Sequence, residues 1–214
     1  MEKTKDISNY FGKKTSEEAI KEIQKIPIES VPGLLLIKDF ITKAEEDQLL
    51  TEINKMPWSN KLKRRVQQYG YEYDYTSRNA ANSLGPLPDF LTFTVDRIME
   101  HSLSTMRPDQ CIVNEYEPGQ GISNHVDIPH LFGDEIISIS LASDVIMEFT
   151  SPDSKKVSVL LPRRSAVILE GDARYKWKHG IPARKKDQLE NGNVLIRGKR
   201  ISLTYRYMKK KIPK

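Results

Sequence analysis

The alternation of apolar and polar residues divides the chain into a first half with helices and a second half of short strands. Apolar residues recur at helical spacing over residues 42–55, where Thr42 and Glu45 form the capping pattern of a helix start, and over residues 90–102. A weaker helical pattern covers residues 16–26. We therefore expect two amphipathic helices, preceded by a short one.

Runs of apolar and β-branched residues dominate from position 110 onward, with turns rich in Gly, Pro, Asp and Ser between them. The expected strands are residues 111–116, 136–141, 145–149, 157–161, 166–169 and 201–207. Earlier strands are predicted over 34–40, after a turn at 31–33, and over 65–75, as a hairpin or a pair of short strands broken near Gly70. Regularly spaced short strands are typical of a β-sandwich or jelly roll.

The expected fold class is α+β, with N-terminal helices against a jelly roll. We expect a polar extension over residues 1–30, a helical and hairpin region over 31–110 and the jelly-roll core over 111–214. Residues 31–214 are long enough to share one hydrophobic core, so we predict that they form one domain.

The composition is that of an ordinary globular protein, with 38% hydrophobic and 29% charged residues. No apolar run approaches the roughly 18–20 residues of a membrane span, and the N-terminus does not resemble a signal peptide. The single cysteine, Cys111, excludes an internal disulfide and suits a reducing compartment. We expect an intracellular monomer, cytoplasmic or nuclear, with no membrane association.

The basic residues are clustered, although the net charge of +5 is modest. The clusters are Lys61–Arg65, Arg163–Arg164, Arg184–Lys186, Arg197–Arg200 and Lys209–Lys211. Such clusters suit contacts with the phosphates of a nucleic acid. They are equally compatible with solvated charged surfaces, and both interpretations stay open.

A candidate metal site begins with His125 and Asp127, two residues apart. In an extended segment such residues point to the same side, so the imidazole and carboxylate can converge on one ion. A sandwich can bring His179 beside them. Two histidines and one carboxylate form the facial triad of non-haem iron oxygenases, which leaves coordination positions free for other ligands. The alternative is that these histidines are simply packed or exposed.

The C-terminal strand offers a second candidate site. Its alternation places Arg200, Ser202, Thr204 and Arg206 on one face and the apolar residues between them on the other. If the polar face lines a cavity, the guanidinium groups require anionic partners, and a dicarboxylate could be held by a bidentate contact. The alternative is an edge strand whose polar face meets solvent. Upstream, Asn114 and Tyr116 also share a strand face and add an amide and a phenol.

These motifs together resemble the AlkB family of Fe(II)/2-oxoglutarate dioxygenases over roughly residues 34–207. The segments that carry the resemblance are NEYEPGQGISNHVD, GDARYKWKHGI and RISLTYR. Ser202 stands where the family usually has asparagine. The resemblance implies a double-stranded β-helix (jelly-roll) core with N-terminal helices and a β-hairpin nucleotide-recognition lid. It also implies oxidation of a group on a nucleic-acid base by dioxygen, with 2-oxoglutarate as co-substrate, as in oxidative dealkylation repair of DNA or RNA.

The same resemblance implies roles for individual residues. Iron would be bound by His125, Asp127 and His179, which form the catalytic centre. The co-substrate would be bound by Asn114, Tyr116, Arg200, Thr204 and Arg206. The nucleic acid would contact Arg65, Tyr71, Tyr73, Arg174 and Arg206. Tyr71, Tyr73 and Tyr75 are spaced to share one strand face, and they could stack on bases or could instead pack into the core.

Within the family, the segments RRVQQYGYEYDY, FGDEIISISL and LLPRRS look most like the branch that hydroxylates a modified wobble uridine in tRNA. That branch commonly adds an RNA-binding and a methyltransferase domain, and neither is found in these 214 residues. Near the N-terminus, Ile7, Tyr10 and Phe11 look like the anchor of a sliding-clamp-binding peptide, with Thr4 in place of its usual glutamine. A polar tail is the alternative there.

Other functions stay open at this point. The chain could be a non-catalytic nucleic-acid-binding module, although such a module would not need the triad and the arginine strand. A zinc hydrolase could use the triad but would leave the two arginines unexplained. An oxygenase that acts on a protein side chain would fit the same residues.

Overall fold

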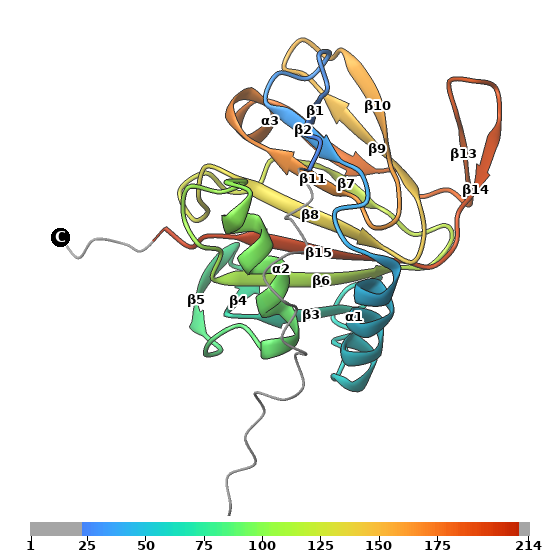
Figure 1. Ribbon diagram of the computed structural model, residues 1–214. Helices are drawn as coiled ribbons and strands as arrows, with labels where there is room; N and C mark the ends of the chain where they lie inside the picture. The colour runs from blue at the N-terminus through green and yellow to red at the C-terminus, as the bar shows by residue number, and fades with distance from the viewer. Residues whose placement is uncertain (1–22, 210–214) are drawn as a thin grey trace, which may run out of the picture.

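Two antiparallel β-sheets face each other, and two helices cover the outer side of the larger sheet (Figure 1). The computed structural model describes residues 23–209, in which three helices and fifteen strands occur. The larger sheet runs in the order β1 (Ile26–Pro27), β2 (Leu34–Ile37), β11 (Ala166–Leu169), β8 (Ile136–Leu141), β15 (Arg200–Arg206), β6 (Gln110–Tyr116) and β3 (Val66–Tyr69). The smaller sheet runs in the order β10 (Lys156–Leu161), β9 (Val145–Thr150), β12 (Lys178–Ile181) and β7 (Ile122–His125).

Two hairpins extend from this framework. One consists of β4 (Tyr71–Asp74) and β5 (Asn79–Ser83), and we call residues 71–83 the lid. The other consists of β13 (Lys186–Gln188) and β14 (Val194–Ile196) and projects from the far end of the sheets in Figure 1. The helices are α1 (Lys43–Lys55), α2 (Asp89–Glu100) and the short α3 (Gly171–Tyr175).

The larger sheet is buried on both faces, which gives the molecule two apolar cores. Between the sheets, Phe149, Met147 and Trp177 pack with the inner face of the larger sheet. On the outer face, Leu49 of α1 and Leu91 of α2 are fully buried in a second core. Each fully buried aliphatic side chain contributes about 1.5–3 kcal/mol to folding. The helices are therefore held by packing on the sheet more than by their own propensity.

The central strand β15 divides its residues between these two environments. Ile201, Leu203 and Tyr205 belong to the core under the helices, and the Tyr205 hydroxyl lies 2.6 Å from the hydroxyl of Thr94 in α2. The polar residues face the space between the sheets. The two-residue alternation expected for this strand is confirmed, and the edge-strand alternative is wrong because β15 pairs with both β6 and β8.

The start of α1 connects the helical layer to the sheets. Thr42 and Glu45 form the predicted capping box, and Arg97 of α2 donates hydrogen bonds to both carboxylate oxygens of Glu45 at 2.6 and 2.9 Å. The next residue, Glu46, is fully buried. Its carboxylate accepts hydrogen bonds from the Ala142 backbone N–H at 2.7 Å and from Arg163 at 2.6 Å. These bonds tie α1 to the turns that follow β8 and β10.

Most predicted elements are confirmed within one or two residues at each end, and the region around Gly70 forms the predicted pair of short strands, whereas the alternative of a hairpin is wrong. The chain forms two short strands on either side of Gly70, and β3 pairs with β6 whereas β4 pairs with β5. Gly70 has a φ of 78°, and a side chain there would collide with the carbonyl of Asp109. This close approach sends the chain out of the larger sheet and into the lid.

Some expectations concern residues that are only partly described. The short helix predicted over 16–26 lies mostly outside the described residues, and Ile26 begins a strand instead. The clamp-like residues Ile7, Tyr10 and Phe11 also lie outside them. Among residues 23–209, no helix has the length and apolar character needed to cross a bilayer.

The contact between Glu45 and Arg97 generates a prediction about stability. Burial would raise the pKa of Glu45, but the hydrogen bonds from Arg97 and Thr42 outweigh burial and lower the pKa from 4.5 to about 2. Glu45→Gln should therefore reduce the free energy of unfolding at pH 7 by about 1–2 kcal/mol, measured by urea titration. Glu52→Gln, a control on the same helix that removes a partly exposed carboxylate paired with Lys55, should cost no more than about 0.5 kcal/mol.

The sign of the pH dependence follows from the lowered pKa. The contribution of Glu45 is complete above about pH 4.5 and is lost as the pH falls towards 2, so the difference between parent and Glu45→Gln should shrink over that range. A difference that stays constant from pH 7 to pH 3 would contradict the ion pair.

Candidate active site

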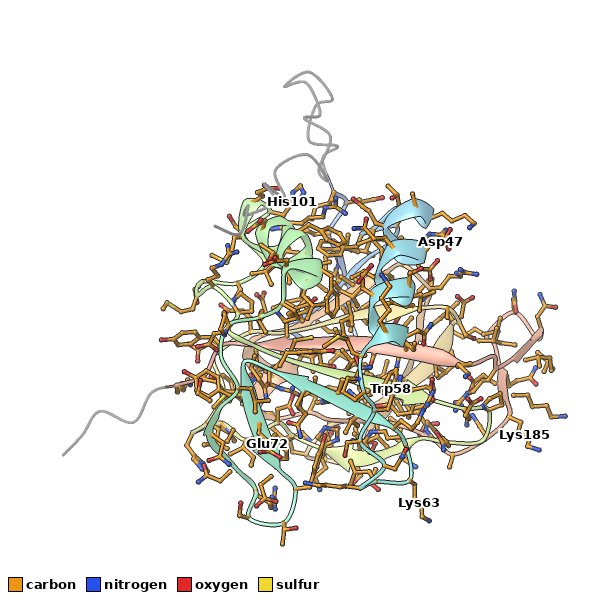
Figure 2. All side chains as sticks on the ribbon, turned by 90° about the horizontal axis from the view of Figure 1, so that it is seen from below. Asp47, Trp58, Lys63, Glu72, His101 and Lys185 are labelled. Carbon is orange, nitrogen blue, oxygen red and sulfur yellow. The ribbon has the colours of Figure 1, made fainter. Side chains whose placement is uncertain are left out.

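A cavity of about 610 Å³ lies between the two sheets and opens beside the lid. Its floor includes the polar face of β15, and its walls include residues of β6, β7 and β12. Tyr73 and Tyr75 of the lid and the preceding segment around Arg64 line its opening. In Figure 2, Glu72 of the lid and Lys63 lie on one side of the sheets, and Asp47 of α1 and His101, just after α2, lie on the opposite side.

The pairing of β7 with β12 brings the two candidate histidines together. His125 ends β7 and is the direct cross-strand partner of His179 in β12, and the two ring centres are 4.4 Å apart. Asp127 follows two residues later, and its Oδ1 is 3.9 Å from Nε2 of His125. The three side chains predicted to form a triad therefore lie together in the cavity.

The protonation states of His179 and Asp127 suit metal binding. Burial, together with the neighbouring His125, lowers the pKa of His179 to about 3, so its imidazole is neutral. Burial would raise the pKa of Asp127, but Arg206 and the two histidines outweigh burial and keep the pKa below its ordinary range. Neutral imidazoles and an ionised carboxylate are the forms that bind Fe(II).

One buried atom of the site is unsatisfied. Nδ1 of His179 has no hydrogen-bond partner among the described residues, and a buried polar atom without a partner is unfavourable. The side chains do not by themselves enclose a metal position, because in the described part of the chain no three His, Cys, Asp or Glu residues are placed to hold one ion. The carboxylate of Asp127 accepts a hydrogen bond from Arg206 at 3.1 Å. Since a carboxylate has about four lone-pair positions, Asp127 can serve both Arg206 and a metal, and the donor set fits iron.

Arg200 provides a second unsatisfied group. Its side chain is 2% exposed, donates to Oγ of Ser140 at 2.8 Å and leaves Nε without a partner in the described structure. Burial lowers the pKa of Arg200 to about 10, so it is still a cation at neutral pH. Its guanidinium carbon lies 5.6 Å from the centre of the Tyr116 ring. A buried cation with so few partners requires an anion, and a ligand carboxylate can supply it.

The other residues expected around a co-substrate lie close by. Tyr116 is the cross-strand partner of Arg200, Asn114 is that of Ser202, and all of them line the cavity together with Thr204. The pairing register of β6 with β15 thus brings the Asn114 amide, the Tyr116 phenol and the Arg200 guanidinium to the same part of the cavity lining. These residues could hold a dicarboxylate.

The predicted substrate contacts are only partly brought together. Tyr73 and Arg206 line the cavity, whereas Tyr71 borders a separate hollow near Arg107. Arg65 makes a bidentate ion pair with Glu115 at 2.7 and 2.8 Å and stacks on Trp58, away from the cavity.

Arg174 also lies outside the cavity lining. It is 1% exposed and donates to the backbone carbonyls of Gly133, Asp127, Ile128 and Phe132 at 2.6–3.4 Å. In this position Arg174 fixes the loop that carries Asp127. Sequence patterns contain no signal for such a role, because the acceptors are backbone atoms.

Two further cavity residues, Arg64 and Tyr75, were predicted only as members of a larger pattern. Arg64 belongs to the predicted basic cluster, but nothing in the sequence distinguishes it from Arg65, which pairs outside. Tyr75 shares the spacing of Tyr71 and Tyr73, and its ring packs edge-on against Tyr73 with centres 4.9 Å apart. The alternation along the lid was a usable signal for Tyr75.

Comparison with known proteins is consistent with this geometry. The chain matches the family described as "2OG-Fe(II) oxygenase superfamily" over residues 9–206. It is 37% identical over 181 residues to "tRNA (carboxymethyluridine(34)-5-O)-methyltransferase alkbh8" of Xenopus tropicalis, which covers 78% of this chain and 29% of that protein. It is 39% identical over 202 residues to "Alkylated DNA repair protein ALKBH8 homolog" of Arabidopsis thaliana, covering 83% and 58%. The chain therefore spans less than two thirds of these relatives.

Another relative has a similar length. "Uncharacterized protein L905" of Acanthamoeba polyphaga mimivirus is 37% identical over 177 residues, covering 81% of this chain and 84% of that protein. Among solved structures, OsALKBH1 superimposes with a TM-score of 0.65 at 18% identity, over 86% of this chain and 99% of the other. A Pseudomonas putida prolyl-4-hydroxylase follows with a TM-score of 0.54 at 14% identity, over 83% and 93%. At these identities the two structures show a shared fold.

The ion pair between Asp127 and Arg206 yields a prediction about the metal site. Asp127→Ala should abolish Mn²⁺ binding, measured by electron paramagnetic resonance, because it removes the only carboxylate of the set. It should also destabilise the protein by about 3–5 kcal/mol, since Arg206 is left buried and unpaired. Asp127→Ala combined with Arg206→Met should recover part of the stability but none of the metal binding. Parent-like Mn²⁺ affinity in Asp127→Ala would exclude Asp127 as a ligand.

Proposed function

The chain belongs to the 2OG-Fe(II) oxygenase superfamily and, within it, to the AlkB family, and on that premise we propose that it oxidises a modified base in nucleic acid. As a member it is a dioxygenase, and the superfamily generally uses Fe(II), 2-oxoglutarate and dioxygen. Iron, when bound by His125, Asp127 and His179, would supply the activation of dioxygen. The protein residues position the co-substrate and the base.

The observation that carries the proposal is the unsatisfied guanidinium of Arg200 in the cavity that the triad also lines. A dicarboxylate placed there would neutralise the buried charge through a bidentate contact. Asn114 and Tyr116 could donate to the remaining ligand oxygens. The other end of such a ligand would lie near His125 and His179, which line the same cavity. A hydrolytic zinc site would leave Arg200 without a function.

Nucleic acid is the substrate class that the cavity opening supports best. Tyr73 and Tyr75 offer aromatic surfaces on which a base can stack, and Lys63 and Arg78 lie at the opening as exposed cations. Relatives named "DNA N6-methyl adenine demethylase" from Caenorhabditis elegans and "Probable RNA/DNA demethylase ALKBH6" from Danio rerio, at 26% and 29% identity, support the same class. A base in a duplex would first have to be flipped out, whereas a single strand avoids that cost of a few kcal/mol.

A second candidate is hydroxylation of a modified wobble uridine in tRNA. The observation that favours it is the 37–39% identity to relatives whose names refer to carboxymethyluridine or to ALKBH8. Both candidates use the same iron and co-substrate residues. They differ in which base enters the cavity.

The two candidates are separated by mass spectrometry of nucleosides. Methylated single-stranded DNA and RNA, and total tRNA, are incubated with the protein, Fe(II), 2-oxoglutarate and ascorbate, and are then digested. Loss of N-methyl nucleosides with release of formaldehyde would support dealkylation, and a gain of 16 mass units on a tRNA uridine, the mass of one oxygen atom, would support hydroxylation. Turnover of 2-oxoglutarate with no change in any nucleoside would contradict a nucleic-acid substrate.

Removal of Arg200 tests the co-substrate site. Arg200→Met should weaken 2-oxoglutarate binding by about 30-fold or more, since a buried charge-assisted contact is worth at least about 2 kcal/mol. Arg200→Lys should recover only part of the lost 2-oxoglutarate affinity, because an ammonium lacks the planar fork of a guanidinium. Calorimetry in the presence of Mn²⁺ measures the 2-oxoglutarate affinity of both variants, and Arg164→Met is a control outside the cavity. Equal affinities in parent and Arg200→Met would rule out the assignment.

A further inference from the structure

The side chain of Gln68 connects the lid to the larger sheet. Gln68 lies in β3, two residues before Gly70, at which the chain leaves that sheet. Its side-chain oxygen accepts a hydrogen bond from the backbone N–H of Tyr73 at 2.6 Å, and its side-chain nitrogen donates to the backbone carbonyl of Tyr73 at 3.1 Å. A residue of a neighbouring antiparallel strand makes the same two hydrogen bonds. The amide of Gln68 therefore takes the place of a strand neighbour at this one position of β4.

Tyr73 lies at the irregular point of the lid hairpin. Glu72 is opposite Asn82 and Asp74 is opposite Asn79, so two steps along β4 correspond to three steps along β5. A shift of this kind disrupts the ladder of hydrogen bonds between two strands. The contact with Gln68 supports the backbone at the position where the hairpin's own pairing is weakest.

A fixed backbone at Tyr73 also fixes the direction of its side chain. The Tyr73 ring lines the cavity, and its centre lies 4.9 Å from that of Tyr75 and 6.1 Å from that of Phe132. Gln68 is not among the described residues that line the cavity. Its influence on a ligand would therefore pass through Tyr73.

The adjacent Gln67 has the same side chain but faces the other way. Gln68 is opposite Ile112 of β6, which lines the cavity. Gln67 is opposite Val113, which belongs to the core under the helices, and it donates to the Ile53 carbonyl of α1 at 2.8 Å. The two glutamines thus tie different elements to the same strand, and Gln67 is a matched control for Gln68.

We propose that Gln68 is a positioning residue for the substrate: its amide holds the backbone of Tyr73 so that the ring faces the cavity opening and stacks on the base that enters. This inference rests on the proposed function, because it concerns how the lid meets the base. The ring offers the stacking surface, and Gln68 keeps that surface in place before the base arrives.

The contact itself is tested by hydrogen exchange of the Tyr73 amide, measured by NMR on the full chain without nucleic acid. Gln68→Met keeps the size of the side chain and removes both hydrogen bonds, so exchange at Tyr73 should be faster by about tenfold or more. The amide of Leu203, in the central strand β15, should change much less. Gln67→Met should lower the urea midpoint of unfolding and leave exchange at Tyr73 unchanged.

The positioning role is tested by a double-mutant cycle. Affinity for single-stranded RNA and DNA oligonucleotides of one sequence is measured by fluorescence anisotropy with Mn²⁺ and saturating 2-oxoglutarate. Tyr73→Ala removes the ring but keeps the backbone groups that Gln68 contacts, and it should weaken binding by about tenfold, the loss of one stacked base. Gln68→Met should weaken binding by about threefold to tenfold, and should cost nothing further when it is added to Tyr73→Ala.

Two controls separate positioning from a general loss of structure. Affinity for 2-oxoglutarate, measured by calorimetry, should be the same in Gln68→Met as in the parent. Gln67→Met should bind the oligonucleotides as the parent does, although it is less stable.

Three results would overturn the proposal. Parental exchange at Tyr73 in Gln68→Met would show that the amide does not hold the lid. Faster exchange with parental oligonucleotide affinity, or losses that add in the double variant, would leave Gln68 a structural residue that does not act through the Tyr73 ring. Failure of the parent to bind either oligonucleotide at low salt would remove the proposed function and the positioning role with it, whereas the exchange result would still stand.

Discussion

Two arginines on one central strand are buried between the sheets, and the compensation of their charges organises the site. Arg206 is neutralised by Asp127, so the strand that forms the floor is tied to the loop that carries a candidate metal ligand. Arg200, six residues earlier along β15, has a serine hydroxyl as its one hydrogen-bond partner among the described residues, and its Nε is unsatisfied. A buried guanidinium is tolerated when it is paired. The protein supplies the partner at one end of the strand and leaves the other end for a ligand.

This arrangement requires that β15 cannot move relative to its neighbours. The strand pairs with β6 and β8 along its length, and Tyr205 anchors its apolar face to α2 through Thr94. Arg174 holds the loop after Asp127 through four backbone carbonyls. Thus the groups that would contact iron and co-substrate are placed by the packed sheets, whereas the lid, which would meet the base, is a two-stranded hairpin outside them. Such a division suits a common reaction centre with variable substrate recognition.

Much of this could be predicted from the sequence because period and spacing are local properties. The capping box of α1 and the alternation of β15 are confirmed, and so is the proximity of His125, Asp127 and His179. What the sequence could not reveal depends on partners far along the chain. Arg64 and Arg65 are adjacent and chemically identical, yet one meets Asn114 in the cavity and the other meets Glu115 outside it, because alternate residues of β6 point to opposite faces. Arg174 is held by carbonyls, which no residue pattern reveals.

The proposed function requires one cavity to bind both a metal, at His125, Asp127 and His179, and a 2-oxo acid, at Arg200. Visible absorption of the protein under anaerobic conditions, with Fe(II) and 2-oxoglutarate added in turn, tests this directly. A weak charge-transfer band should appear only when both are present, because a 2-oxo acid bound in the same cavity would then coordinate the iron. Tight binding of both without such a band would show that they occupy separate sites and would contradict a shared cavity.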